Sequence, residues 1–221
     1  MTSFVETPVP TPVAPKPTMR GWLHLIGVFV LFAASPVLFV RTKTWPQVGW
    51  VLCYLVGVGA MMSTSAAFHR IKWSTPARQR MKRADHSAIF LAIAGSYLGI
   101  AGLTMHGTFR VVVIILMVVA TAVGITLRQI SLNAPKWVNT LPYLVVGWAA
   151  VAVMPQIYRG GGPACFAFIV AGGVAYSVGA VFYGTHWPKL NPRVFGYHEL
   201  FHACTIVGAG CHFAALAVAL H

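Results

Sequence analysis

The side chains best suited to chemistry in this sequence are histidines with a helical spacing. His198 and His202 are four residues apart, so a helix carries both imidazoles on one face, about 6 Å apart along its axis. Two such nitrogens can bind one zinc ion, and a third histidine with an open fourth position is the arrangement of catalytic zinc sites. We expect His69 to be that third ligand, and Ser65 lies four residues before it.

Acidic residues are rare in the chain, which has only Glu6, Asp85 and Glu199. Asp85 stands at the start of an apolar segment, where an ionisable group is costly and therefore a candidate for function. We predict that Asp85 and Ser65 belong to the same site as the three histidines.

The composition excludes an ordinary soluble domain. Hydrophobic residues make up 57% of the 221 residues and charged residues only 9%, whereas soluble domains carry about 25% charged residues. The surplus apolar surface must face lipid. The net charge of +13 comes from cations in short connections between apolar runs, so anionic lipid headgroups explain it and nucleic acid is not an expected partner.

The four cysteines form no CxxC motif and lie in apolar segments, where they are expected to be small buried side chains.

Seven apolar runs predict the elements that position these residues, each near the roughly 20 residues that span a bilayer. The runs lie near 21–40, 47–69, 85–104, 109–128, 137–157, 163–184 and 199–220. We therefore predict an all-α, seven-transmembrane-helix bundle over residues 21–221. Residues 1–20 contain five prolines between Pro8 and Pro17, which predicts a disordered, proline-rich tail. Gly95 and Gly99 have the small-residue spacing of close helix contacts, which we expect to be internal to the bundle.

The distribution of Lys and Arg predicts the orientation. With the amino terminus inside, 12 of the 16 cations fall in inside segments and 4 in outside segments. This asymmetry favours a cytoplasmic amino terminus. Short loops and the absence of a cleavable signal are typical of a multi-pass protein of a bacterial cytoplasmic (inner) membrane.

This topology brings the candidate residues to one depth. The run ending at His69 travels inward, and the runs opening at Asp85 and His198 travel outward. All the candidate side chains should therefore share one layer near the cytoplasmic face. His212 is ten residues beyond His202, about 15 Å along the helix, and should not reach the same ion. We assign no role to His24, His86 or His212, and expect His24, like other lone histidines near the interface, to be a hydrogen-bonded interfacial residue.

A second interpretation rests on residues 198–202, which read HELFH and match HExxH. In zinc proteases of this motif the histidines bind the metal and the glutamate is the general base. The motif does not explain why His69 and Asp85 share the same depth, and it lacks a clear distal carboxylate ligand. A membrane protease is therefore the less favoured alternative.

Three motifs in order resemble the haemolysin III branch of the progestin and adipoQ receptor family, whose animal members are the adiponectin receptors. They are SxxFH at 65–69, DHSAIFLAIAGSY from Asp85, and FGYHELFHxxxxxGxxxHF in the last run. The resemblance covers about 21–220 and implies a seven-helix fold with the amino terminus inside. It also implies that the three histidines bind zinc, with Asp85 and Ser65 beside the metal-bound water. Related receptors have Gln at the position of Glu199, which argues against an essential base there.

Two departures from the family pattern touch no proposed ligand. Phe68 replaces a common Tyr, and Leu98 and Gly99 stand where a proline often follows. The resemblance implies a ceramidase-like hydrolase of lipid amide or ester bonds, with membrane lipids as substrate or ligand. A receptor or lipid-state sensor with structural zinc stays open as an alternative. A pore-forming cytolysin is disfavoured because the sequence has no charged rings or polar stripe. The sequence does not define an oligomeric state.

Overall fold

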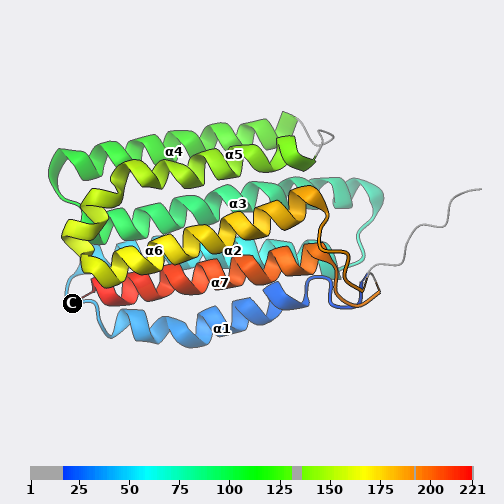
Figure 1. Cartoon of the computed structure of the whole chain (residues 1–221), viewed down its shortest axis with the longest axis horizontal. Coiled ribbons are helices and arrows are strands. Elements are labelled where there is room, and N and C mark those ends of the chain that lie inside the picture. Colours follow the sequence, from blue (N-terminus) through cyan, green and yellow to red (C-terminus); the bar gives the residue numbers. More distant parts are fainter. Residues whose placement is uncertain (1–16, 131–135, 192, 221) are drawn as a thin grey trace, which may run out of the picture.

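The computed structural model describes residues 17–130, 136–191 and 193–220, and these residues form helices without strands. Most of the predicted proline-rich tail, residues 1–16, lies outside the described residues. The helices run side by side along one axis (Figure 1). In chain order they are α1 Trp22–Phe39, α2 Trp45–Arg70, α3 Thr75–Thr104, α4 Gly107–Ile130, α5 Lys136–Trp148, the 3-10 helix η1 Ala149–Val153, α6 Met154–Thr185 and α7 Tyr197–Ala219.

Six helical stretches of the described chain are long and apolar enough to cross a membrane. Five correspond to single helices, and the sixth joins α5, η1 and α6 over Thr140–Thr185. Large apolar side chains such as Phe32, Leu116 and Val207 lie exposed on the outside of the bundle. A bundle with apolar side chains outside as well as inside fits a lipid environment, because lipid replaces water as the surrounding solvent.

The sixth stretch is not one straight rod. Gly162 has a φ of 78° and ψ of 175°, which interrupts the helix, and Figure 1 shows the chain running back beside α5 after this region. Trp148 donates a hydrogen bond from Nε1 to Ser177 Oγ at 3.0 Å. In a continuous helix, 29 residues of separation would place them more than about 40 Å apart. The stretch therefore consists of two antiparallel parts.

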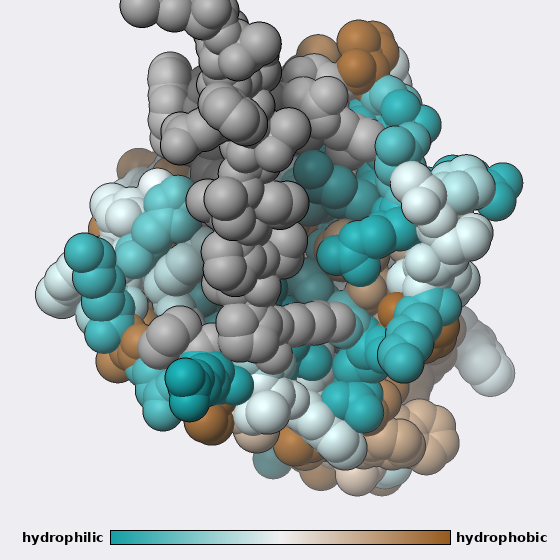
Figure 2. Space-filling model, turned by 90° about the vertical axis from the view of Figure 1, so that its right-hand side faces the viewer, coloured by the Kyte–Doolittle hydropathy of each residue, from teal (hydrophilic) through white to brown (hydrophobic). Residues whose placement is uncertain are grey.

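Helix α3 begins earlier than the apolar pattern predicts. The predicted run starts at residue 85, but α3 starts at Thr75, with Pro76 in its first turn. Proline is favoured there because its missing N–H has no helical partner to lose. Much of the basic stretch between the second and third runs is thus an extension of α3 rather than a loop. Figure 2 looks onto this end of the bundle, where hydrophilic side chains gather.

Close packing fixes the relative positions of α2, α3 and α7. A Cβ on Gly95 would stand 2.5 Å from the carbonyl oxygen of Cys53, so only glycine allows α3 to approach α2 this closely. This agrees with the predicted internal packing of Gly95. The buried Tyr54 hydroxyl on α2 donates to the carbonyl of Ala209 on α7 at 2.6 Å. This bond links α2 to α7, and α1 and α3 each pack against both of these helices. Both α2 and α7 carry candidate ligands.

Candidate metal centre

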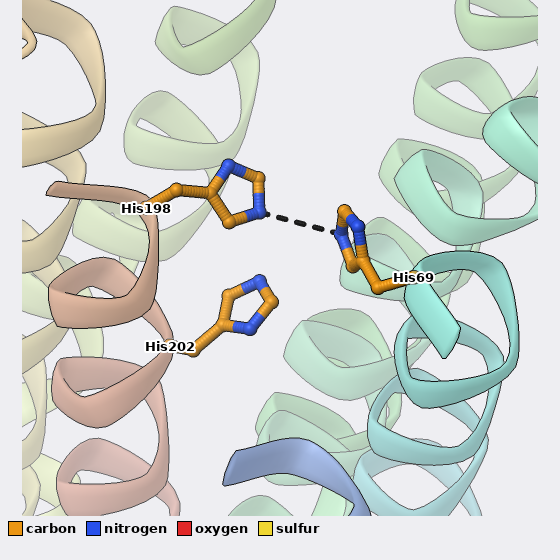
Figure 3. Close-up of side chains that lie close together, drawn as sticks. All are labelled: His69, His198 and His202. Carbon is orange, nitrogen blue, oxygen red and sulfur yellow. Dashed lines mark hydrogen bonds between the residues drawn. The ribbon is translucent and has the colours of Figure 1, made fainter. Parts of the chain in front are cut away.

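Three histidines from two helices face one another in the structure (Figure 3). His69 lies in the last turn of α2, and His198 and His202 lie in the first turns of α7. Their ligand nitrogens all lie within 4.8 Å of one another. The Nε2 atoms of His69 and His198 are 3.3 Å apart and form a hydrogen bond between the rings. The helical spacing places His198 and His202 on one face of α7, and α1 and α3, which each pack against both α2 and α7, hold His69 opposite them.

The geometry of the three rings can be compared with what zinc requires. Zinc binds imidazole nitrogens at about 2.0–2.1 Å in tetrahedral geometry, which places two ligand nitrogens about 3.3 Å apart. The His69 and His198 nitrogens already have this separation. With the whole set within 4.8 Å, the widest nitrogen pair would have to close by at most about 1.5 Å. His69 and His202 are also buried, so the residues present fit a resident zinc ion.

Asp85 and Ser65 lie beside this centre. The Asp85 carboxylate on α3 and the Ser65 hydroxyl on α2 lie near each other. Both residues line one cavity of about 880 Å³, together with all three histidines. The structure thus brings the five residues singled out in the sequence to a single cavity.

The cavity extends far beyond the histidines and becomes apolar. Its lining follows α3 from Asp85 to Ala101, a length of about 24 Å along the helix axis. Apolar residues of α3 and α6 dominate this part, among them Ile89, Ile93, Ile100 and Ile157. The cavity is long and mostly apolar, and the three histidines, Asp85 and Ser65 line its histidine end. Its dimensions suit an acyl chain whose carbonyl lies at the level of the histidines.

Glu199 is turned away from the histidines. One carboxylate oxygen forms an ion pair with Arg20, and the other accepts a hydrogen bond from the Gly196 N–H at 2.8 Å. The second bond caps the start of α7 in the manner of a capping box. With both oxygens engaged and the side chain 1% exposed, Glu199 serves as a helix cap and ion-pair partner. This arrangement does not suit the general base of an HExxH protease.

The sequence interpretation missed His24, which we expected to be an ordinary interfacial residue. His24 on α1 is buried and stacks on His202, with ring centroids 4.0 Å apart and an interplanar angle of 11°. Its Nε2 atom hydrogen-bonds Thr205 Oγ1 at 2.9 Å. The sequence did hold a clue to this contact. His24 lies near the start of the first apolar run, which is at the same predicted membrane depth as the candidate residues.

Two other histidines line the same cavity but are not among the three candidate ligands. The Nδ1 atom of His86 contacts the carbonyl of Lys82 at 2.8 Å, and the Tyr143 hydroxyl donates to the carbonyl of His86 at 3.0 Å. His212 lies deeper along α7, with its ring edge-on to Tyr176 at a centroid distance of 5.4 Å. His212 is outside the cluster of possible metal ligands, as its distance along the helix predicts.

Comparison with known proteins decides the family. The family described as "Haemolysin-III related" matches residues 13–213. The chain belongs to this haemolysin III family. The "Hemolysin-3 homolog" of Bacillus subtilis (strain 168) is 24% identical over 193 residues, covering 86% of this chain and 87% of the relative. The resemblance to the haemolysin III branch is thereby confirmed.

Eukaryotic relatives connect this haemolysin III protein to adiponectin-receptor-like proteins. The "ADIPOR-like receptor IZH2" of Saccharomyces cerevisiae is 25% identical over 240 residues, covering 97% of this chain and 74% of the relative. The "Heptahelical transmembrane protein ADIPOR2" of Oryza sativa subsp. japonica is 27% identical over 194 residues, covering 80% and 82%. With the six apolar stretches, these matches identify an integral, multi-pass membrane protein.

Proposed function

We propose that this haemolysin III protein is a zinc-dependent hydrolase of lipid amide or ester bonds. One observation carries the proposal: three imidazoles from α2 and α7 converge in a long, mostly apolar cavity that Asp85 and Ser65 also line. A metal centre alone would serve many purposes. A carboxylate, a hydroxyl and an apolar channel of lipid dimensions next to it favour hydrolysis of a lipid.

Each residue has a role in this mechanism. His69, His198 and His202 would hold the zinc ion, which lowers the pKa of a coordinated water to about 7 and so supplies a nucleophile at neutral pH. The Asp85 carboxylate accepts the proton of the attacking water. The Ser65 hydroxyl donates a hydrogen bond to the oxyanion that develops on the substrate carbonyl. The apolar lining of α3 and α6 binds the acyl chain and aligns the carbonyl with the histidines.

We further propose seven membrane crossings with a cytoplasmic amino terminus. The fold-back near Gly162 supports the number, because it divides the Thr140–Thr185 stretch into two antiparallel parts. The charge distribution supports the orientation. Arg41, Lys43, Arg110 and Arg159 flank the end of the bundle opposite the histidines, and the other described cations flank the histidine end. In a bacterium, a centre at this end of the bundle would lie near the cytoplasmic face of the inner membrane.

Lipid turnover by the purified protein tests the hydrolase. The protein in vesicles of natural phospholipids and ceramide is followed by mass spectrometry for released fatty acid, with and without a zinc chelator. We expect the chelator to stop release and Asp85→Asn to lower it by about 10²–10⁴-fold with zinc content unchanged, the usual contribution of a general base. Release that survives both treatments would exclude this mechanism.

A receptor with structural zinc is the second candidate, favoured by the names of the eukaryotic relatives. The two functions predict different results in the same experiment. If zinc is structural, the chelator lowers the melting temperature of the protein while no lipid is hydrolysed under any condition.

A further inference from the structure

Two cations on α3 face the cavity next to the metal centre. Arg78 and Lys82 are four residues apart, and Lys82 precedes Asp85 by three, so all three lie on one face of the helix. All three line the cavity. Beyond Asp85 the same face continues with Ile89, Ile93 and other apolar residues of the lining. Along this stripe the order is therefore cation, cation, carboxylate, and then apolar side chains.

Contacts with α2 place the Arg78 guanidinium close to the histidines. Its Cζ atom lies 5.1 Å from the centre of the Phe68 ring, and the Phe68 and His69 rings are 4.8 Å apart between centroids. Arg78 Cζ is thus within about 10 Å of the His69 ring, while Lys82 lies about 4.5 Å from Asp85 along the α3 axis. In a glycerophospholipid only a few bonds separate the phosphate from the acyl carbonyl, which is a comparable span.

Membrane orientation alone does not account for these two side chains. The basic stretch 70–83 carries six cations, and orientation requires only that they lie on the correct side of the membrane. Lys72, Arg78 and Arg80 are all exposed and Lys82 is half-buried. Of these four, only Arg78 and Lys82 line the cavity. The end of the molecule that carries this stretch is strongly hydrophilic (Figure 2).

The charge of this entrance is positive. The chain has three acidic residues, of which Glu6 lies outside the described residues. Glu199 pairs with Arg20, another cation of the lining, which leaves Asp85 as the acidic residue of the centre itself. An anionic group entering the cavity would meet two cations from α3 just above the site of chemistry.

We propose that Arg78 and Lys82 bind the phosphate of an anionic lipid headgroup, so that the ligand of the cavity is an anionic glycerophospholipid. Arginine suits this role because its planar guanidinium donates in pairs to phosphate oxygens, and lysine adds a point charge. The bound phosphate would hold the acyl carbonyl at the level of the histidines and direct the chain into the apolar part of the cavity. The assignment of this lipid as a substrate rests on the proposed hydrolase function, but its binding does not.

Binding of non-hydrolysable lipids separates the two proposals. The full chain in neutral detergent is titrated with dialkyl ether phosphatidylglycerol or dialkyl ether phosphatidylcholine, and bound lipid is counted by native mass spectrometry. We expect a preference for the anionic lipid that falls roughly tenfold or more in the Arg78→Gln/Lys82→Gln variant, since each cation contributes to headgroup attraction. The Lys72→Gln/Arg80→Gln variant removes the same charge from the exposed surface and should keep the preference. Zinc content and a monodisperse elution profile show that each variant is folded.

Three results would overturn the site. An equal loss in both double variants would mean that general surface charge attracts the lipid. If the wild type binds the two lipids equally well, the cations do not recognise an anionic headgroup. Displacement of the lipid by millimolar inorganic phosphate would mean that the site binds free phosphate. Retained preference without fatty acid release from natural lipids would count against the hydrolase and leave this binding site intact.

Discussion

Two levels of one cavity each carry buried histidine nitrogens on α7, and only one of them resembles a metal centre. At the first level His198 and His202 meet His69 of α2, with nitrogens as close as 3.3 Å. At the second level His212 meets Tyr176 of α6 with its ring edge, and neither ring nitrogen is solvent-accessible. Lining a membrane cavity is therefore not enough to make a histidine a candidate metal ligand. Convergence of nitrogens from two different helices distinguishes the first level from the second.

The packing at the second level is tight and specific. A Cβ on Gly172 would stand 2.5 Å from Cδ2 and 2.6 Å from Nε2 of His212. The His212 ring therefore occupies space that α6 leaves by having glycine at this position. At the first level the histidine nitrogens converge, whereas at the second level the His212 ring fills the space beside Gly172.

Removal of single histidines tests this comparison with the largest expected effect. His198→Ala deletes a ligand and should lower zinc affinity by more than about 100-fold, because even indirect partners of ligands cost 10–100-fold. His212→Ala, the matched change on the same helix, should leave zinc affinity unchanged. Zinc content by elemental analysis and competition with a coloured chelator measure both. Comparable loss in the two variants would erase the distinction between the levels.

Loss of His24 should have an intermediate effect on the first level. The His24 ring stacks on the His202 ring with centroids 4.0 Å apart and hydrogen-bonds Thr205. It would therefore orient the His202 ring without binding the metal itself. We expect His24→Ala to weaken zinc binding by about tenfold or more, and His24→Phe, which keeps a ring against His202, to weaken it less. The absorption spectrum of the cobalt-substituted protein should shift in the alanine variant. An unchanged spectrum and affinity would make His24 a packing residue only.

A methyl group added at the second level should have the smallest effect. Gly172→Ala pushes against the His212 ring and should lower the free energy of unfolding by about 1–2 kcal/mol, a common cost of overpacking. Gly173→Ala is the control, because nothing lies within 4 Å of a Cβ there. Denaturation in detergent measures both, and zinc affinity should not change in either. A larger effect of Gly172→Ala on zinc than on stability would couple the two levels.

The sequence predicted the candidate site better than it predicted the supporting contacts. The rarity of polar residues in apolar runs and their common depth singled out the five residues that line one cavity. Glu199 could not be placed in advance, because its partner Arg20 is 179 residues away in the chain. The stacking of His24 on His202 likewise depends on how α1 packs against α7. Apolar periodicity also cannot show that α3 begins at Thr75, because a helix that extends beyond the lipid needs no apolar residues there.

The ion pair between Arg20 and Glu199 is one of several contacts that join residues 18–20 to the start of α7 and the segment before it. The backbone N–H groups of Thr18 and Met19 donate to the carbonyls of Arg193 and Val194, at 3.0 and 3.2 Å, in the segment that leads into α7. The residues just ahead of α1 thereby hold the segment that leads into α7, the helix that carries His198 and His202. Shortened forms of the protein prepared for biochemistry should therefore retain everything from Thr18 onward. A truncation beyond Thr18 would remove these hydrogen bonds next to the start of α7, where the candidate ligands His198 and His202 lie.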